Sequence, residues 1–181
     1  VELPSQLYEH WLSEPAVLKT FARHFKTGMP MPDSLLERLK AARNFNMGFA
    51  TVEYTAAAII DMDLHAMSDP KALDVTAFEA DTLKRIGMPK EIVLRHRLPH
   101  FSHIMGGYAA GYYSYLWSEV MDADAFGAFQ EKGDPFDKPT AKRLAENVYS
   151  AGNRREPGAA YVAFRGRPPK VDALLKKRGF A

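Results

Sequence analysis

Apolar residues recur every three or four positions along most of the chain, which is the spacing of one face of an α-helix. Val17, Leu18 and Phe21 follow this spacing and predict a helix that Gly28 ends. The apolar run from Phe45 to Met67 contains no proline and is too long for a strand, so it predicts a buried helix that stops at Ser68-Asp69-Pro70. No stretch alternates with the period of two that a strand requires.

Prolines, glycines and capping residues set the limits of the other elements. Helices are expected over 4–12, 15–28, from Asp33 or Ser34 through Leu39, 45–67, 74–86, 108–121 with a continuation or restart over 124–132, 139–149, 156–166 and 171–177. The segment 96–107 contains Pro99 and two glycines and is expected to be a loop. Because the linkers are short, residues 1–181 are predicted to form one all-α domain, a helical bundle without an internal boundary.

The composition is that of a folded chain and excludes several kinds of functional site. Of 181 residues, 46% are hydrophobic and 25% charged, which is enough apolar material for a core. Cysteine is absent, so disulfides, thiolate metal sites and a cysteine nucleophile are excluded. The apolar runs are far too short to cross a bilayer, and no basic start precedes an apolar stretch as in a signal peptide. We therefore expect a cytoplasmic protein with no membrane partner.

The charge is unevenly distributed, although the net charge is only +2. Residues 152–181 contain eight basic side chains, opposed only by Glu156 and Asp172. Such a tail can bind phosphate or nucleic acid. More often it is a solvated helix face or pairs with an acidic surface elsewhere in the fold. We favour these alternatives and expect no nucleic-acid partner.

Three histidines within eight residues raise the possibility of zinc binding. His96 and His100 are four apart, and His100 and His103 are three apart, so on a helix each pair would share a face. Pro99 disfavours that helix, and the spacing does not supply a closed set of three or four ligands. A loop with hydrogen-bonding histidines is the favoured interpretation, and an imidazole that donates to a substrate is an intermediate one.

Two further polar patterns admit a functional and a structural interpretation. Asp61 and His65 share a helical face and resemble a ligand cluster, but local pairing at a polar helix end is favoured. Gly106 and Gly107 directly before a helix start can expose amide donors to an anion, although such a pair is usually only a turn.

Tyrosines cluster on the helix expected over 108–121. At 100° per residue, Tyr108, Tyr112 and Tyr115 fall within an arc of roughly 60°, whereas Tyr113 lies well off it. Buried phenols need hydrogen-bond partners, and convergent phenols can donate to a developing oxyanion. The competing interpretation is an aromatic stripe in the core.

Several motifs together resemble one known family of enzymes. These are Val1-Glu2-Leu3-Pro4-Ser5-Gln6 followed by Glu9-His10-Trp11, Phe45-Asn46-Met47-Gly48-Phe49, the block from Leu98 to Glu119, and the ending Phe164-Arg165-Gly166-Arg167 to Lys177-Arg178-Gly179-Phe180. The chain resembles the thimet oligopeptidase and peptidyl-dipeptidase family of zinc metallopeptidases over essentially its whole length. The resemblance implies peptide-bond hydrolysis of short peptides and a zincin-like, neurolysin-like catalytic domain of which this chain is the C-terminal part.

The resemblance also implies roles for individual residues. Glu2 matches the family's third zinc ligand, and His103 matches a histidine that contacts substrate near the scissile carbonyl. Gly106 and Gly107 match a mobile loop over the cleft. Tyr108, Tyr112 and Tyr115 match tyrosines that face the cleft; Tyr108 and Tyr115 are the better candidates for binding the substrate backbone and the tetrahedral oxyanion.

One family motif is missing from the sequence. No His-Glu-x-x-His occurs, so two of three zinc ligands and the general base are absent. We therefore expect a fragment that is inactive alone, needs the part carrying the other zinc ligands, and associates with itself through exposed apolar helices. Endo-oligopeptidase and peptidyl-dipeptidase specificities both stay open, and the alternative is a non-catalytic helical module that binds peptides or another protein.

Overall fold

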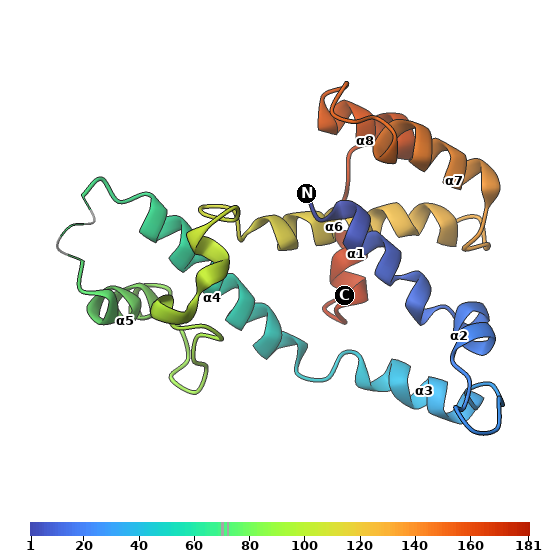
Figure 1. The fold of residues 1–181 in the computed structure, drawn as a ribbon, viewed down its shortest axis with the longest axis horizontal. Coiled ribbons are helices and arrows are strands. Elements are labelled where there is room, and N and C mark those ends of the chain that lie inside the picture. The colour runs from blue at the N-terminus through green and yellow to red at the C-terminus, as the bar shows by residue number, and fades with distance from the viewer. Residues whose placement is uncertain (70, 72) are drawn as a thin grey trace. The chain divides into compact units, whose positions relative to one another are not determined.

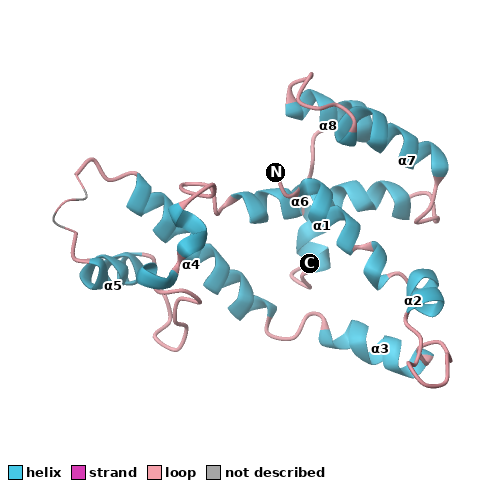
Figure 2. Cartoon of the chain, in the orientation of Figure 1, coloured by secondary structure: helices cyan, strands magenta, loops and turns pink. Residues whose placement is uncertain are grey.

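The computed structural model describes residues 1–69, 71 and 73–181. In these residues every regular element is a helix, as Figure 1 and Figure 2 show, and pairing of the β type is limited to an isolated antiparallel bridge between Arg23 and Pro30. The predicted all-α fold is confirmed. Pro70, in the predicted stop after the long apolar run, lies outside the described residues.

Two helices are long, α4 (Met47–His65) and α6 (Ser114–Gln130). The shorter α-helices are α1 (Leu3–Glu9), α2 (Pro15–Phe21), α3 (Asp33–Ala42), α5 (Val75–Arg85), α7 (Lys138–Leu144), α8 (Pro157–Arg165) and α9 (Asp172–Lys177). Single turns of other helix types are the 3₁₀ turns η1 (Trp11–Ser13), η2 (Leu98–His100) and η3 (Ser102–Met105) and the π turn η4 (Ala145–Tyr149). The segment 96–107, expected to be a loop, therefore contains two short 3₁₀ turns.

The helix predicted over 15–28 is wrong in its second half. α2 ends at Phe21, and the chain folds back so that the Met31 N–H donates to the Ala22 carbonyl at 2.9 Å. Phe21 and Phe25 are 79% and 86% exposed, so a longer helix would have no core against which to pack its apolar stripe. Gly28, with φ of +68°, lies in the turn of this fold-back rather than at a helix end.

Residue contacts divide the chain into two compact units. The first unit comprises Val1–Phe45 and Leu116–Ala181, and the second comprises Asn46–Tyr115. Each has its own apolar core: the first includes Leu7, Phe126, Phe129, Leu144, Tyr161 and Phe164, and the second includes Ala56, Ile60, Leu98, Phe101, Ile104 and Tyr112. The single domain expected from the short linkers stays a prediction.

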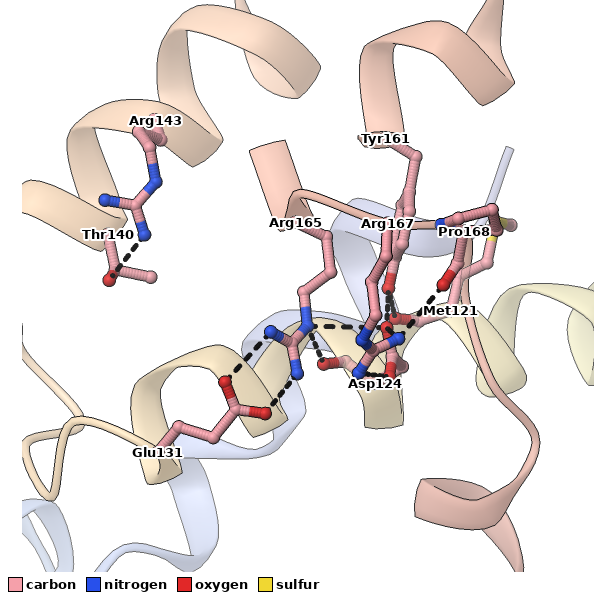
Figure 3. A network of polar contacts seen from close by, with 9 residues as sticks. All are labelled: Met121, Asp124, Glu131, Thr140, Arg143, Tyr161, Arg165, Arg167 and Pro168. Carbon is pink, nitrogen blue, oxygen red and sulfur yellow. Dashed lines mark hydrogen bonds and ion pairs between the residues drawn. The ribbon is translucent and has the colours of Figure 1, made fainter. Parts of the chain in front are cut away.

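A buried carboxylate, Asp124, organises the polar contacts of the first unit (Figure 3). Asp124 is 2% exposed, and its carboxylate accepts hydrogen bonds from the Tyr161 hydroxyl and from Arg167 Nη2, both at 2.7 Å. Arg165 donates from Nε to the Asp124 carbonyl at 3.0 Å and forms an ion pair with Glu131. Burial and the hydrogen bond to Asp124 raise the pKa of Tyr161, which keeps the phenol protonated as the donor.

Four of the eight basic side chains in the C-terminal stretch form ion pairs with acidic residues. Besides Arg165 and Arg167, Lys177 lies 3.4 Å from Glu119 and 3.2 Å from Asp122, and Arg178 pairs with Glu119. These acids lie on α6, so the expected pairing of the tail with an acidic surface is confirmed for these side chains. The expected absence of a nucleic-acid partner stays a prediction.

Among the described residues, no helix is both long enough and apolar enough to cross a membrane. Apolar side chains nevertheless reach solvent in the N-terminal part of the first unit. Eight of them are more than half exposed: Val1, Tyr8, Leu12, Phe21, Phe25, Met29, Leu39 and Phe45. Exposed apolar surface of this kind tends to find a partner.

We therefore expect the isolated chain to self-associate. Its weight-average sedimentation coefficient should rise with concentration, because association removes these side chains from water. Replacing Phe25 and Leu39 together by aspartate should shift the association to higher concentrations, whereas a matched replacement of exposed Val93 in the second unit should not. A strictly monomeric chain at high concentration would contradict the prediction.

Candidate functional site

Three tyrosines surround one histidine in the second unit. His103 lies in η3, Tyr108 and Tyr112 lie in the turns that follow it, and Tyr115 lies in the first turn of α6. The His103 ring meets the rings of Tyr108, Tyr112 and Tyr115 at centroid distances of 4.8, 5.3 and 5.5 Å, each nearly perpendicular. Tyr108 also stacks on Tyr115 at 5.3 Å. We call these four residues the His103 cluster.

The backbone that brings these rings together is not the predicted helix. α6 begins at Ser114, so a helix starting at residue 108 is wrong. Residues 106–113 form turns instead, with the Gly111 N–H donating to the Tyr108 carbonyl at 2.9 Å and Ala110 in the left-handed conformation at φ +52°. The tyrosines therefore converge through a compact turn and not through helical periodicity.

Gly106 and Gly107 are exposed and directly precede Tyr108 in the chain. Neither takes a positive φ, and a Cβ added to either would meet no atom within 4 Å. They do not directly precede a helix, since α6 starts only at Ser114. The two glycines therefore have open surroundings and do not form the anion-binding start of a helix. Their predicted role in a loop over a cleft stays a prediction.

Hydroxyl groups in the His103 cluster differ in accessibility. The Tyr115 hydroxyl lies 2.9 Å from His103 Nε2 in an exposed setting. Tyr112 is only 8% exposed and packs edge-on against Phe101 and stacked against Tyr54. Burial raises the pKa of Tyr112, with smaller contributions from nearby Tyr115 and Glu53, so its phenol stays protonated at neutral pH. Tyr115 and His103 consequently present the accessible polar atoms.

Histidines 96, 100 and 103 do not form a metal site in the structure. His96 stacks on Phe101 at 5.4 Å, whereas His103 faces the tyrosines. In the described part of the chain, no group of three or more His, Asp or Glu side chains could hold a metal ion. The His103 Nε2 lies 2.9 Å from the Tyr115 hydroxyl, as expected for a loop with hydrogen-bonding histidines.

Glu2, the expected zinc ligand, lies at the N-terminus of α1 in the first unit. Its Oε2 accepts a hydrogen bond from Ser5 Oγ at 2.8 Å, and the side chain is half-buried. One carboxylate cannot provide the three protein ligands of a catalytic zinc site. The donor set in the described residues therefore does not fit a complete zinc site.

Two buried carboxylates hold the segment that bears the His103 cluster, and this role of theirs was not predicted from the sequence. Asp61, in α4, accepts hydrogen bonds from the backbone N–H groups of Ala110 and Tyr112, each at 2.9 Å. Glu79, in α5, accepts from the Leu98 N–H and pairs with Arg97. The expected local pairing of Asp61 is also present, since His65 Nδ1 lies 2.8 Å from its carboxylate.

A signal for Asp61 was present in the sequence. Asp61 directly follows the apolar run Ala56-Ala57-Ala58-Ile59-Ile60 in a helix predicted to be buried. A carboxylate at such a position must find polar partners, because burial of an unpaired charge is costly. Which donors it finds is decided by residues about fifty positions later.

Comparisons with known proteins agree with the motifs quoted above. Residues 1–180 match the sequence model of peptidase family M3. The chain is 41% identical to oligopeptidase A and 38% identical to dipeptidyl carboxypeptidase, both of Escherichia coli, and 37% identical to a probable cytosolic oligopeptidase A of Arabidopsis thaliana. Each match covers 99% of this chain but only 26%, 27% and 26% of the relative, respectively. The chain thus spans about a quarter of the length of these relatives.

Proposed function

Because the chain belongs to peptidase family M3, we propose that it works as the C-terminal part of a peptidase that hydrolyses peptide bonds in short peptides. The match over residues 1–180 carries this proposal. The relatives named oligopeptidase and dipeptidyl carboxypeptidase support peptides as the substrate class, and both specificities are compatible with the residues present. A cytoplasmic location is part of the proposal and is supported by the relative named as cytosolic.

In this proposal the His103 cluster forms the wall that binds the substrate and stabilises the oxyanion. His103 and Tyr115 act at the scissile carbonyl, because their accessible polar atoms lie 2.9 Å apart and can converge on one oxygen. If His103 carries its proton on Nε2, it donates to the Tyr115 oxygen, and the phenol can donate its own proton to the developing oxyanion. Tyr108, stacked on Tyr115, binds the substrate backbone.

The remaining residues have supporting roles in the proposal. Tyr112 contributes to the cleft wall through its ring, since its hydroxyl is in the more buried position. Gly106 and Gly107 lie over the substrate, where their open surroundings leave room for a peptide.

Zinc is the metal that the family implies, and Glu2 is proposed as one of its ligands. The other ligands and the general base would come from a partner segment outside this chain, because the described residues do not supply them.

A first experiment tests whether the chain is inactive alone. Purified chain with excess zinc should not cleave an internally quenched fluorogenic oligopeptide above background and should bind zinc weakly, because one oxygen ligand cannot build the site. Chelator-sensitive turnover that survives Glu2→Ala would show that a second metal site exists within these residues.

A second experiment tests the proposed function itself. E. coli oligopeptidase A with its matching segment replaced by this chain, called here the joined peptidase, should show chelator-sensitive turnover of the same peptide. Glu2→Gln should abolish that turnover and lower the zinc content. Glu9→Gln, a matched change at an exposed position of the same helix, should alter neither. A folded joined peptidase without turnover would refute the proposal.

A further inference from the structure

Residues 97–112 form the second half of the connection between α5 and α6 and carry three members of the His103 cluster, yet this segment contains only single 3₁₀ turns and other turns. Few of its backbone groups are bonded within regular structure, so its conformation must be imposed from outside. Both of its ends contact a carboxylate of a neighbouring helix. Asp61, in α4, is 0% exposed, and Glu79, in α5, is 3% exposed.

Contacts at the C-terminal end of the segment are the more extensive. Asp61 Oδ1 accepts from the Ala110 N–H and Oδ2 accepts from the Tyr112 N–H, so each carboxylate oxygen holds one amide. The Tyr112 carbonyl in turn accepts a hydrogen bond from the Tyr54 hydroxyl. Tyr54 and Asp61 are seven residues apart, which places them on one face of α4 two turns apart. Both backbone groups of Tyr112 are therefore held by α4.

The conformation at Ala110 requires this support. A non-glycine residue at φ +52° is strained and persists only where its surroundings fix it. One amide bonded to Asp61 is that of Ala110 itself, and the other is that of Tyr112, two residues later. Backbone N–H groups around a left-handed residue can form a concavity that favours an anion, and here the Ala110 and Tyr112 N–H groups both donate to the Asp61 carboxylate.

His65 completes the surroundings of Asp61. Its Nδ1 lies 2.8 Å from Asp61 Oδ1 and 2.9 Å from the Asp61 carbonyl. Carboxylate and carbonyl oxygens only accept hydrogen bonds, so His65 carries a proton on Nδ1 and is the donor. The two amides and this imidazole therefore give the buried carboxylate polar partners at both oxygens.

At the N-terminal end of segment 97–112, Glu79 holds the backbone in the same way as Asp61 does at the C-terminal end. One of its carboxylate oxygens accepts from the Leu98 N–H, and the other pairs with the Arg97 guanidinium. Leu98 then begins η2 and enters the core of the second unit at 4% exposure.

We propose that Asp61 and Glu79 are positioning residues, which fix segment 97–112 at its two ends and thereby hold His103 within reach of Tyr108, Tyr112 and Tyr115. The anchoring of segment 97–112 does not depend on the proposed function. The claim that it serves catalysis by the His103 cluster does rest on that function. Neither carboxylate touches the substrate in this account; each acts through backbone amides.

Backbone amide exchange of the ¹⁵N-labelled chain, followed by NMR, tests the anchoring without any assay of activity. In the unaltered chain, the amides of Leu98, Ala110 and Tyr112 should be protected although they lie outside the α-helices. Asp61→Asn removes a charged acceptor and should speed exchange of the Ala110 and Tyr112 amides roughly ten- to hundredfold, with little change at Leu98. Glu79→Gln should give the reverse pattern.

A matched control and a side-chain signal separate positioning from general destabilisation. Asp63→Asn makes the same chemical change on the same helix, at a residue that pairs with Arg85, and should leave all three amides unchanged. Asp61→Asn should also shift the imidazole signals of His103, because its contact with Tyr115 is loosened, while a general loss of stability would speed exchange throughout α4.

Two results would overturn the proposal. One is unprotected exchange of Ala110 and Tyr112 in the unaltered chain, which decides the matter even if a variant fails to fold. The other is equal acceleration across α4 and segment 97–112 in Asp61→Asn. A joined peptidase without turnover, in contrast, would refute the proposed function and leave the anchoring untouched.

Discussion

Replacing Asp124 by alanine should destabilise the first unit by about 3–5 kcal/mol, because it leaves buried cationic and polar partners without their acceptor. Asp124 is 2% exposed, and the Arg165 side chain beside it is 8% exposed. The Tyr161 hydroxyl would lose its bond to the carboxylate and keep only that to the Met121 carbonyl. A loss of this size is a large fraction of the stability of an ordinary domain.

Tryptophan fluorescence during urea unfolding measures this effect in the appropriate unit. The two tryptophans of the chain, Trp11 and Trp117, both belong to the first unit. The midpoint for Asp124→Ala should fall strongly, with a free energy of unfolding lower by the amount above.

Glu131→Ala is the matched control for Asp124→Ala. Glu131 also pairs with Arg165, and the guanidinium holds the pKa of Glu131 below its usual range, but the Glu131 side chain is 60% exposed. An exposed ion pair contributes about 1 kcal/mol or less. Equal losses in the two variants would show that burial of Asp124 does not govern the network of Figure 3.

The elements predicted well from the sequence are those whose stabilising contacts are local or periodic. α4 was predicted from an apolar run without proline, and α5, expected over 74–86, begins at a side-chain cap in which Asp74 accepts from the Ala77 N–H at 3.0 Å. In both cases the information lies within one or two helical turns. The family itself was identified from longer motifs that span the chain.

Elements set by distant contacts were predicted less well. A helix is expected from residue 108, but Asp61, about fifty residues earlier, holds the Ala110 and Tyr112 amides in another conformation. The end of α2 also depends on tertiary packing, since Phe21 and Phe25 find no core in this chain. Local propensity is a weak guide wherever such contacts decide the conformation.

Tyr108, Tyr112 and Tyr115 lie together as expected, although the helix that was expected to bring them together does not begin at residue 108. Helical arithmetic placed the three phenols on one face, whereas the structure gathers them around His103 through turns. The three rings are therefore close together both in the expected helix and in the observed turn. Their proposed roles depend on the observed contacts and not on the predicted helix.

Replacing Tyr115 by phenylalanine in the joined peptidase should lower kcat roughly a hundredfold or more, with little change in KM. The substitution removes the hydroxyl that lies 2.9 Å from His103 Nε2 but keeps the ring that stacks on Tyr108 at 5.3 Å. Folding and substrate binding should therefore be retained, while a donor proposed to act on the developing oxyanion is lost. An effect on kcat alone is what a contact made in the transition state predicts.

Tyr113→Phe is the matched control for Tyr115→Phe. Tyr113 is adjacent in sequence and loses the same hydroxyl, but it is 48% exposed and lies outside the His103 cluster. Its kcat and KM should equal those of the unaltered joined peptidase. A kcat for Tyr115→Phe near that of the unaltered protein would remove Tyr115 from the proposed oxyanion site, and a raised KM with unchanged kcat would reassign it to ground-state binding of the peptide.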